Sequence, residues 1–331
     1  MQGKCTCVGD HVSSLISIIT PAYNEAQNLP LVFERLSRVF EKLVFEWEWI
    51  IVDDHSSDNT FETIRQIVSQ DNRVRGIRLS RNFGSHIAII CGLQNAQGDC
   101  VTIMAADLQD PPEILPELFA KWQEGAQVIW AVRARREFEK ASTRGFSRLY
   151  HLIMSNIVGI KEMPATGADF FMIDRQVVNA FRQFKEGNVS ILALITWMGF
   201  RQTSITYDKQ PRLHGRSNWS LGRKVKLAID SIMSFSFFPI RLMSYLGFAI
   251  SLLGFLYASF IVVHAISGQP LQGWSSLIVV VLVIGGIQIL MMGILGEYLW
   301  RTLDEARRRP RYLIEAVVNA KPSQEQERNE A

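Results

Sequence analysis

The sequence has one long region without charged side chains, and it lies near the C-terminal end. Between Arg241 and Glu297, no position of this 331-residue chain is occupied by Asp, Glu, Lys or Arg. A membrane-spanning helix needs about 20 apolar residues, so this region has room for two spans and a short turn. We expect the spans near residues 242–265 and 275–297, with the sequence Ser-Gly-Gln-Pro at 267–270 breaking the pair.

The connection between the two predicted spans also lacks Lys and Arg, whereas both flanks are rich in them. Because basic flanks stay on the cytoplasmic side, we expect a multi-pass protein of the inner (cytoplasmic) membrane, with its globular part and both termini cytoplasmic. The basic residues behind this orientation are Arg212, Arg216, Arg223, Lys224, Lys226 and Arg241 before the first span, and Arg301, Arg307, Arg308, Arg309 and Arg311 after the second.

Cysteine is scarce, and the net charge is small. The four cysteines, Cys5, Cys7, Cys91 and Cys100, lack the spacing of a secreted disulfide framework, so we expect reduced thiols in a cytosolic compartment. The formal net charge of +3 is too small to predict nucleic-acid binding. The basic residues beside the spans fit an anionic membrane surface instead.

Before the two predicted spans, which with their turn form a helical hairpin, short apolar runs alternate with amphipathic segments. This pattern is typical of βα units around a mostly parallel sheet. Helices are expected between the strands, at about 26–43, 59–70, 85–96, 112–124, 174–184 and 188–198. The expected strands are 15–20, 47–52, 74–79, 100–106, 128–132, 169–173 and 202–207.

These segments predict five regions along the chain. The main one is an α/β domain, and the hairpin follows it. In chain order, we expect a flexible N-terminal tail at 1–13, the α/β domain at 14–218, interfacial amphipathic helices at 219–240, two transmembrane helices at 241–300 and a cytoplasmic tail at 301–331.

Two polar clusters follow predicted buried strands. The first contains Asp53 and Asp54, and the second contains Asp107, Gln109 and Asp110. Open α/β sheets bind ligands at the carboxyl ends of their strands. In extended chain Asp107 and Gln109 would face the same side and could offer oxygen atoms to one Mg²⁺ or Mn²⁺. Each cluster could also be a helix cap, but two adjacent carboxylates exceed what a cap requires, so we favour nucleotide and metal binding.

The end of the first predicted strand carries a third candidate contact, in the sequence Thr-Pro-Ala-Tyr-Asn-Glu at 20–25. The ring of Tyr23 and the carboxylate of Glu25 could hold a nucleobase and its ribose. The alternative is an ordinary strand-to-helix turn with Pro21 and a capping Asn24. The neighbouring Asp54 favours ligand binding.

Three further charged residues are candidates for contacts with phosphate or substrate. Arg133 stands at a strand end, where an arginine fork can grip phosphate oxygens. Asp169 opens an apolar run and needs a partner, so it either pairs with an arginine or faces a substrate. Arg212 begins a glycine-containing basic loop that either touches a lipid phosphate or anchors the chain beside the membrane.

Together, these motifs resemble the polyprenyl-phosphate glycosyltransferases of glycosyltransferase family 2. That group includes dolichyl-phosphate mannose synthases and bacterial bactoprenol glucosyltransferases with a two-span C-terminal hairpin. The resemblance runs from about Leu15 to Arg311. It implies a Rossmann-like GT-A fold, a nucleotide-sugar donor, a Mg²⁺ or Mn²⁺ ion, a polyprenyl phosphate acceptor such as undecaprenyl phosphate, and a homo-oligomer, a tetramer by analogy.

The resemblance also implies roles for individual positions. Asp169 matches a functionally important aspartate of the hairpin-bearing members, and with Asp107 and Arg133 it forms the implied catalytic set. The other carried-over positions are Pro21, Tyr23, Glu25, Val52, Asp54 and Ala106 as nucleotide contacts, Asp107 and Gln109 as metal ligands, and Arg133 and Arg212 as contacts to the diphosphate.

Two positions depart from the family pattern. Ala105 stands where the family usually has the first aspartate of an Asp-x-Asp motif, and Asn218 stands where a lysine is common. The first departure removes one acidic contact, so metal binding would depend on Asp107, Gln109 and the phosphates of the donor. The second removes one expected cation from the basic loop.

The resemblance implies transfer of one sugar, from a UDP-sugar in preference, to polyprenyl phosphate at the cytoplasmic face, with inversion and a metal requirement. Two alternatives stay open: a catalytically lapsed membrane scaffold, motivated by Ala105, and use of GDP-mannose as in dolichyl-phosphate mannose synthases. A processive polysaccharide synthase is disfavoured because the sequence has no Gln-x-x-Arg-Trp. A transporter subunit is disfavoured because the spans have no acidic or basic residues to line a path.

Overall fold

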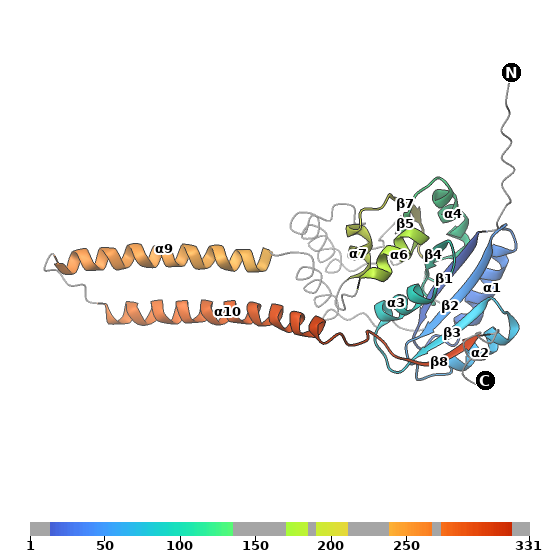
Figure 1. Ribbon diagram of the computed structural model, residues 1–331, viewed down its shortest axis with the longest axis horizontal. Coiled ribbons are helices and arrows are strands. Elements are labelled where there is room, and N and C mark those ends of the chain that lie inside the picture. The colour runs from blue at the N-terminus through green and yellow to red at the C-terminus, as the bar shows by residue number, and fades with distance from the viewer. Residues whose placement is uncertain (1–13, 135–169, 185–189, 211–237, 267–272, 320–331) are drawn as a thin grey trace, which may run out of the picture.

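The computed structural model describes residues 14–134, 170–184, 190–210, 238–266 and 273–319 (Figure 1). An α/β domain and two long helices that extend away from it make up this part of the chain. The predicted N-terminal tail, residues 219–237 of the predicted interfacial helices, Asp169 and Arg212 lie outside the described residues, whereas residues 238–240 begin the first long helix.

One eight-stranded sheet forms the centre of the α/β domain, in the order β7-β5-β6-β4-β1-β2-β3-β8. Strands β4, β1, β2 and β3 are parallel neighbours, and so are β5 and β7. Strand β6 runs antiparallel to β4 and β5, and β8 runs antiparallel to β3. The predicted α/β class with a mostly parallel sheet is confirmed. The strands are β1 Leu15–Ala22, β2 Glu46–Asp53, β3 Val74–Leu79, β4 Cys100–Ile103, β5 Val128–Arg133, β6 Phe170–Asp174, β7 Gln202–Tyr207 and β8 Ile314–Asn319.

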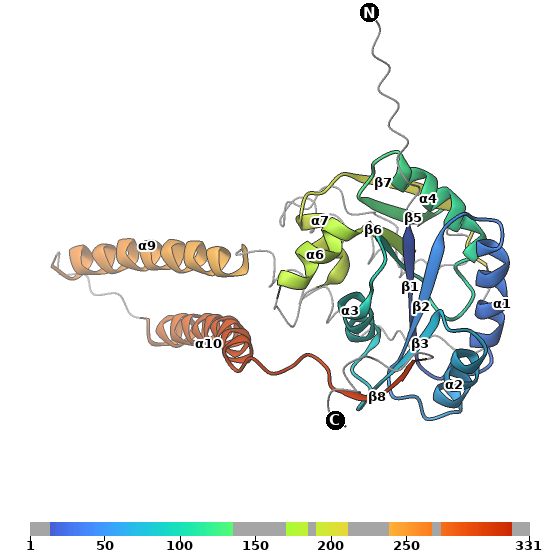
Figure 2. The same ribbon diagram turned by 45° about the vertical axis from the view of Figure 1, so that its right-hand side comes forward.

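Helices cover both faces of the sheet, and each face has its own hydrophobic core. Helices α1, α2 and α4 pack on one face, and α3, α6 and α7 pack on the other (Figure 2). Burial on both sides explains why the central strands are almost continuously apolar. The helices of the domain are α1 Leu29–Phe40, α2 Thr60–Gln70, α3 Ser85–Asn95, α4 Leu115–Gln123, α6 Arg175–Gln183 and α7 Ile191–Trp197, with a 3-10 turn at Pro112–Ile114.

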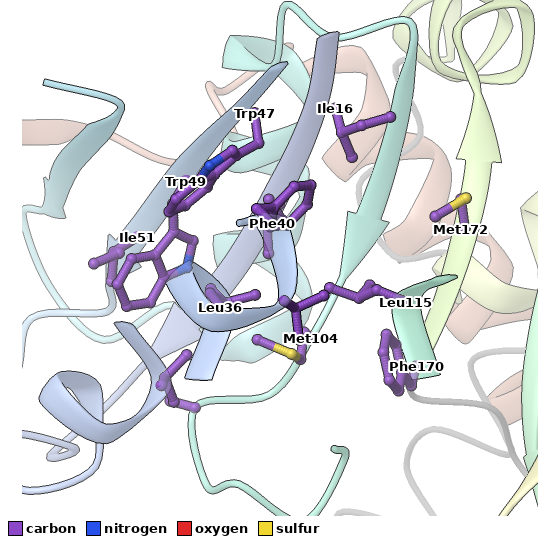
Figure 3. Close-up of a cluster of buried hydrophobic side chains, with 14 of the residues drawn as sticks. Ile16, Leu36, Phe40, Trp47, Trp49, Ile51, Met104, Leu115, Phe170 and Met172 are labelled. Atoms are coloured by element: carbon purple, nitrogen blue, oxygen red, sulfur yellow. The ribbon is translucent and has the colours of Figure 1, made fainter. Parts of the chain in front are cut away.

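Aromatic side chains fill much of the first core (Figure 3). The rings of Phe40 and Trp47 stack with centroids 5.0 Å apart. Trp49 is fully buried, and its indole N–H donates to the Thr20 hydroxyl at 2.9 Å. Burying one such side chain stabilises the fold by about 1.5–3 kcal/mol. This core therefore fixes β1 and β2, whose carboxyl ends carry two of the predicted contact sites.

Strand β4 is shorter than the predicted strand 100–106, because its pairing with β1 and β6 ends at Ile103. Met104 makes one more backbone hydrogen bond, to the carbonyl of Ile19, and the chain then leaves the sheet. Leu108 has a φ of 57°, in the left-handed region, so the backbone turns there. The predicted extended arrangement of Asp107 and Gln109 is therefore wrong.

After β7 the chain forms two long apolar helices, α9 Phe238–Ile266 and α10 Trp274–Ala306, which lie side by side and extend away from the domain (Figure 1). Both are long and apolar enough to cross a membrane, with the most apolar windows at Ile240–Tyr257 and Val283–Ala306. Apolar side chains such as Phe248 and Phe255 are exposed on α9. The two predicted apolar helices are thus present in the structure.

The chain then returns to the sheet. Strand β8 pairs with β3 at one edge, as Figures 1 and 2 both show. This strand was not predicted, since residues 301–331 were expected to form a cytoplasmic tail. The hairpin is consequently an insertion between two strands of one sheet.

Candidate active site

The loops after β1 and β2 meet at the carboxyl edge of the sheet. Ala22 and Asp53 are register partners, so the residues that follow each strand are neighbours. The backbone N–H of Asn24 donates to the Ser56 hydroxyl at 2.9 Å, and that of Glu25 donates to the Thr60 hydroxyl at 2.8 Å. These hydrogen bonds hold the two loops in one preformed arrangement.

Asp54 is the buried carboxylate of this arrangement. It is 3% exposed, and its two oxygens accept hydrogen bonds from the backbone N–H groups of Phe83 and Gly84, each at 2.7 Å. Burial raises the pKa of Asp54 above its ordinary value, and the two N–H groups oppose that rise. The loop between β3 and α3 therefore fixes the carboxylate that the sequence analysis predicted as a nucleotide contact.

Asp53 has a different environment from its neighbour. It is fully buried, one oxygen accepts the Ser56 backbone N–H at 2.9 Å, and the other lies 3.6 Å from Nε of Arg78. Its contacts are thus with the protein, and they shape the loop that follows β2.

The remaining predicted nucleotide contacts divide into two groups. Pro21, Tyr23 and Glu25 are partly exposed at the strand edge, and Glu25 accepts a hydrogen bond from Asn28 at 2.5 Å. The side chains of Val52 and Ala106 are instead buried in the two cores. Packing therefore occupies the side chains at these two positions.

Asp107 and Gln109 lie in the turn that follows β4. Asp107 is 7% exposed, and one of its oxygens accepts the backbone N–H of Gln109 at 3.1 Å. The turn at Leu108 keeps the two residues close together even though they are not on a strand. Ala105, which stands where a second carboxylate was expected, is partly exposed beside them.

Asp110 connects this turn to β7, the strand at one edge of the sheet. It is 1% exposed, it accepts a hydrogen bond from the Tyr207 hydroxyl, and it lies 3.9 Å from the ammonium of Lys209. Arg133 and Tyr207 are register partners on β5 and β7 and share a side-chain hydrogen bond. Burial, together with the negative charge of Asp110, raises the pKa of Tyr207, so the hydroxyl keeps its proton at neutral pH.

The structure thus brings Arg133 to the Asp107 turn through Tyr207 and Asp110. Tyr207 and Lys209 were not predicted as site residues, because no local pattern links them to a turn about a hundred positions earlier. In the part of the chain that the structure describes, no three His, Cys, Asp or Glu side chains are grouped to hold a metal ion. Asp107 and Gln109 nevertheless offer carboxylate and amide oxygens, the donors that hard divalent cations prefer.

A mostly parallel sheet with carboxylates and an arginine at the ends of its strands is the arrangement of α/β enzymes, which bind ligands at the carboxyl edge of the sheet. The chain belongs to glycosyl transferase family 2, whose model matches residues 17–182. It is a glycosyltransferase with a GT-A fold, followed by two apolar helices.

The relatives match nearly the whole chain. An uncharacterized glycosyltransferase of Synechocystis, sll0501, is 39% identical over 300 residues, which cover 90% of this chain and 94% of that relative. The bactoprenol glucosyl transferase of Shigella phage SfII is 30% identical over 308 residues, which cover 93% of this chain and 99% of that relative.

A solved structure of glucosyl-3-phosphoglycerate synthase from Mycobacterium tuberculosis, in complex with Mn²⁺, UDP-glucose and phosphoglyceric acid, is more distant. Its sequence identity is 16%, its TM-score is 0.49, and the match covers 66% of this chain and 78% of the other.

Proposed function

We propose that this glycosyltransferase moves one sugar from a nucleotide sugar, a UDP-sugar in preference, to a membrane polyprenyl phosphate at the cytoplasmic face. The carrying observation is that two membrane-length helices are inserted into the same sheet whose strand ends carry Asp54, Asp107 and Arg133. The similarity to a bactoprenol glucosyl transferase over 99% of its length, the hairpin included, supports a lipid-linked acceptor.

The nucleotide of the donor would bind where the loops after β1 and β2 meet. Asp54 is held rigidly by two N–H groups, which is suited to accepting hydrogen bonds from a base or a ribose. Tyr23 and Glu25 are partly exposed on the neighbouring loop and would complete this contact, with Pro21 beside them. The contribution of Val52 and Ala106 would come from their backbone.

The diphosphate would lie between the Asp107 turn and Arg133. Asp107 and Gln109 would hold a Mg²⁺ or Mn²⁺ ion, with oxygens of the donor phosphates as further ligands. When bound, this ion supplies positive charge to the departing diphosphate. Arg133 adds a fixed cation on the same side, which Tyr207 orients. Arg212 would provide another phosphate contact.

The reaction needs no strong general base. The second pKa of a phosphate monoester is about 6, so the acceptor carries close to two negative charges at neutral pH. An acceptor oxygen attacks the anomeric carbon in line, the bond between that carbon and the diphosphate oxygen breaks, and the electron pair leaves with the nucleoside diphosphate. The configuration at the anomeric carbon is thereby inverted. We assign Asp169 to positioning of the acceptor or the sugar.

The membrane arrangement follows the distribution of charge. Basic residues flank both apolar helices, so the domain and both termini would lie on the cytoplasmic side. Gly285, Gly286 and Gly293 on α10 have open space beside them, and small residues permit close helix packing between chains. A homo-oligomer, for example a tetramer, is consistent with such a surface.

The test is sugar transfer by the full-length protein purified in detergent. Undecaprenyl phosphate is offered with labelled UDP-glucose, UDP-galactose, UDP-N-acetylglucosamine or GDP-mannose, with Mn²⁺ or with EDTA, and label is counted in the organic phase. We expect metal-dependent label from one UDP-sugar. Label from GDP-mannose alone would correct the donor. Failure to bind any of these nucleotides, with or without Mn²⁺, would contradict the proposed function and favour a lapsed scaffold.

A further inference from the structure

Strand β8 places a carboxylate against the nucleotide edge of the domain. One oxygen of Glu315 lies 3.1 Å from Nδ1 of His55 and 3.2 Å from Nε of Arg78. His55 directly follows Asp54, and Arg78 lies 3.6 Å from the second oxygen of Asp53. A residue that follows the membrane hairpin therefore contacts both the chain neighbour of Asp54 and the arginine beside Asp53.

The backbone of β8 is shaped for this contact. Arg78 pairs with Ala316 and Leu79 pairs with Ile314, so the register shifts at Glu315 and leaves it as an extra residue on its strand. Such β-bulges commonly re-aim a side chain and occur beside functional sites. The bulge turns Glu315 toward the end of β2.

The same segment also supports the loop that holds Asp54. The backbone N–H of Ser80 donates to the carbonyl of Leu313 at 2.9 Å, at the start of the loop whose Phe83 and Gly84 N–H groups bind the Asp54 carboxylate. Two sets of contacts thus connect this segment to Asp54. One passes through the loop from Ser80 to Gly84, and the other passes through His55, the residue that follows Asp54.

A third set of contacts connects Glu315 to the loop after β1, which carries Tyr23 and Glu25. Arg78 contacts Asp53 and also donates to the Ser56 carbonyl at 3.4 Å. Asp53 holds the backbone N–H of Ser56, and the Ser56 hydroxyl accepts the N–H of Asn24. Displacement of Arg78 would therefore reach the turn that carries Tyr23 and Glu25.

We infer that Glu315 is a positioning residue for the donor nucleotide, supplied by the strand that follows the membrane hairpin. The inference depends on the proposed use of Asp54 and its neighbours as nucleotide contacts. The side chains of Glu315 and Arg78 are 46% and 25% exposed, and ion pairs that solvent reaches add little to folding stability. The effect of Glu315 should accordingly be found in ligand affinity.

The test compares Glu315→Gln with Asn319→Ala in the full-length protein in detergent. Asn319 lies at the other end of β8, where it accepts a hydrogen bond from Arg75 at 3.2 Å, so it reports on strand docking alone. Binding of UDP and GDP is measured by calorimetry, donor KM and kcat by transfer, and thermal unfolding by fluorescence. We expect Glu315→Gln to raise the nucleotide Kd and the donor KM about fivefold or more, the lower range of coupling between sites. Its kcat and unfolding midpoint, and all values for Asn319→Ala, should stay near those of the wild type.

Wild-type affinity in Glu315→Gln would overturn the inference and leave the proposed function intact. Equal losses in both variants, or a loss of affinity matched by a large fall in the unfolding midpoint, would identify a purely structural contact and also overturn it. A wild-type protein that binds neither UDP nor GDP would overturn the proposed function, and this inference with it.

Discussion

The hydroxyl of Tyr207 donates a hydrogen bond to the carboxylate of Asp110, although 97 positions separate them in the sequence. Tyr207 ends β7 beside Arg133, and Asp110 ends the turn that carries Asp107 and Gln109. This contact therefore fixes the turn of the proposed metal site relative to the proposed phosphate-binding arginine.

Tyr207→Phe removes the hydroxyl and keeps the ring. A hydrogen bond to a buried charged group contributes about 1.5–3 kcal/mol, so we expect the free energy of unfolding to fall by that amount in urea. Sugar transfer should fall as well, because the Asp107 turn loses its support from β7. Ser204→Ala, at an exposed position of the same strand, is the control. If the two variants behave alike, the contact has no such role.

Gly84→Ala tests the loop that holds Asp54. Gly84 has φ 97° and ψ 153°, a conformation that is almost restricted to glycine, and alanine there costs about 1–3 kcal/mol. The strain is relieved by moving the N–H that binds Asp54, so we expect weaker nucleotide binding together with lower stability. No atom lies within 4 Å of the added Cβ, so a steric clash is not the cause.

Gly199→Ala is the matched control for Gly84→Ala. Gly199 also has a positive φ, 72°, and open space for a Cβ, but it lies in the turn after α7. We expect it to lower stability by about 1–2 kcal/mol, the usual cost of a left-handed alanine, while nucleotide affinity stays unchanged. Equal nucleotide affinity in the two variants would show that the Gly84 N–H does not support the site.

Cys91 provides a chemical test of how the C-terminal segment docks on α3. Its side chain is fully buried and shares a hydrogen bond with Tyr312, two residues before β8. Burial raises the pKa of the Cys91 thiol to about 11. Since only the thiolate reacts, we expect very slow alkylation at pH 8 and a rate that rises as the pH approaches 11.

The alkylation experiment uses a variant with Cys5 and Cys7 replaced by serine, so that the two buried cysteines remain. Cys91 and Cys100 lie on the same tryptic peptide, residues 82–121, so fragmentation of that peptide by tandem mass spectrometry assigns the modification to one or the other. The urea-unfolded protein, in which both should react rapidly, is the control. Rapid labelling of Cys91 in the folded protein at pH 8 would contradict the docked position of Tyr312.

The sequence predicted the parts of the fold whose signal is local. Apolar runs placed β1, β2 and β5 to within two residues, since strands buried on both faces need continuous apolar side chains. The uncharged region placed α9 and α10 for a similar reason. The end of β4 was misplaced, because pairing partners, which a sequence pattern does not reveal, decide where a strand ends.

Strand β8 and the Tyr207 contact could not be predicted for the same physical reason. The sequence Ile-Glu-Ala-Val-Val-Asn at 314–319 is short, and it has no regular alternation of apolar and polar residues. Its role depends on β3, which lies more than two hundred positions earlier. The candidate residues at strand ends were predictable because chain direction in a parallel sheet brings those ends together. The residues that position them come from elsewhere in the sequence.

The most direct test of the account is transfer of label from a nucleotide sugar to undecaprenyl phosphate by the wild type and by Asp107→Asn, side by side. Asp107→Asn would weaken the metal site and so remove several kcal/mol of stabilisation of the charge that develops on the leaving diphosphate. That loss corresponds to a fall in rate of about a hundredfold or more. The variant should therefore be nearly inactive, while its nucleotide affinity equals that of the wild type. Asp208→Asn, the same change at an exposed position near the site, should transfer label as the wild type does. Equal transfer by wild type and Asp107→Asn would contradict the assignment of the site at the end of β4.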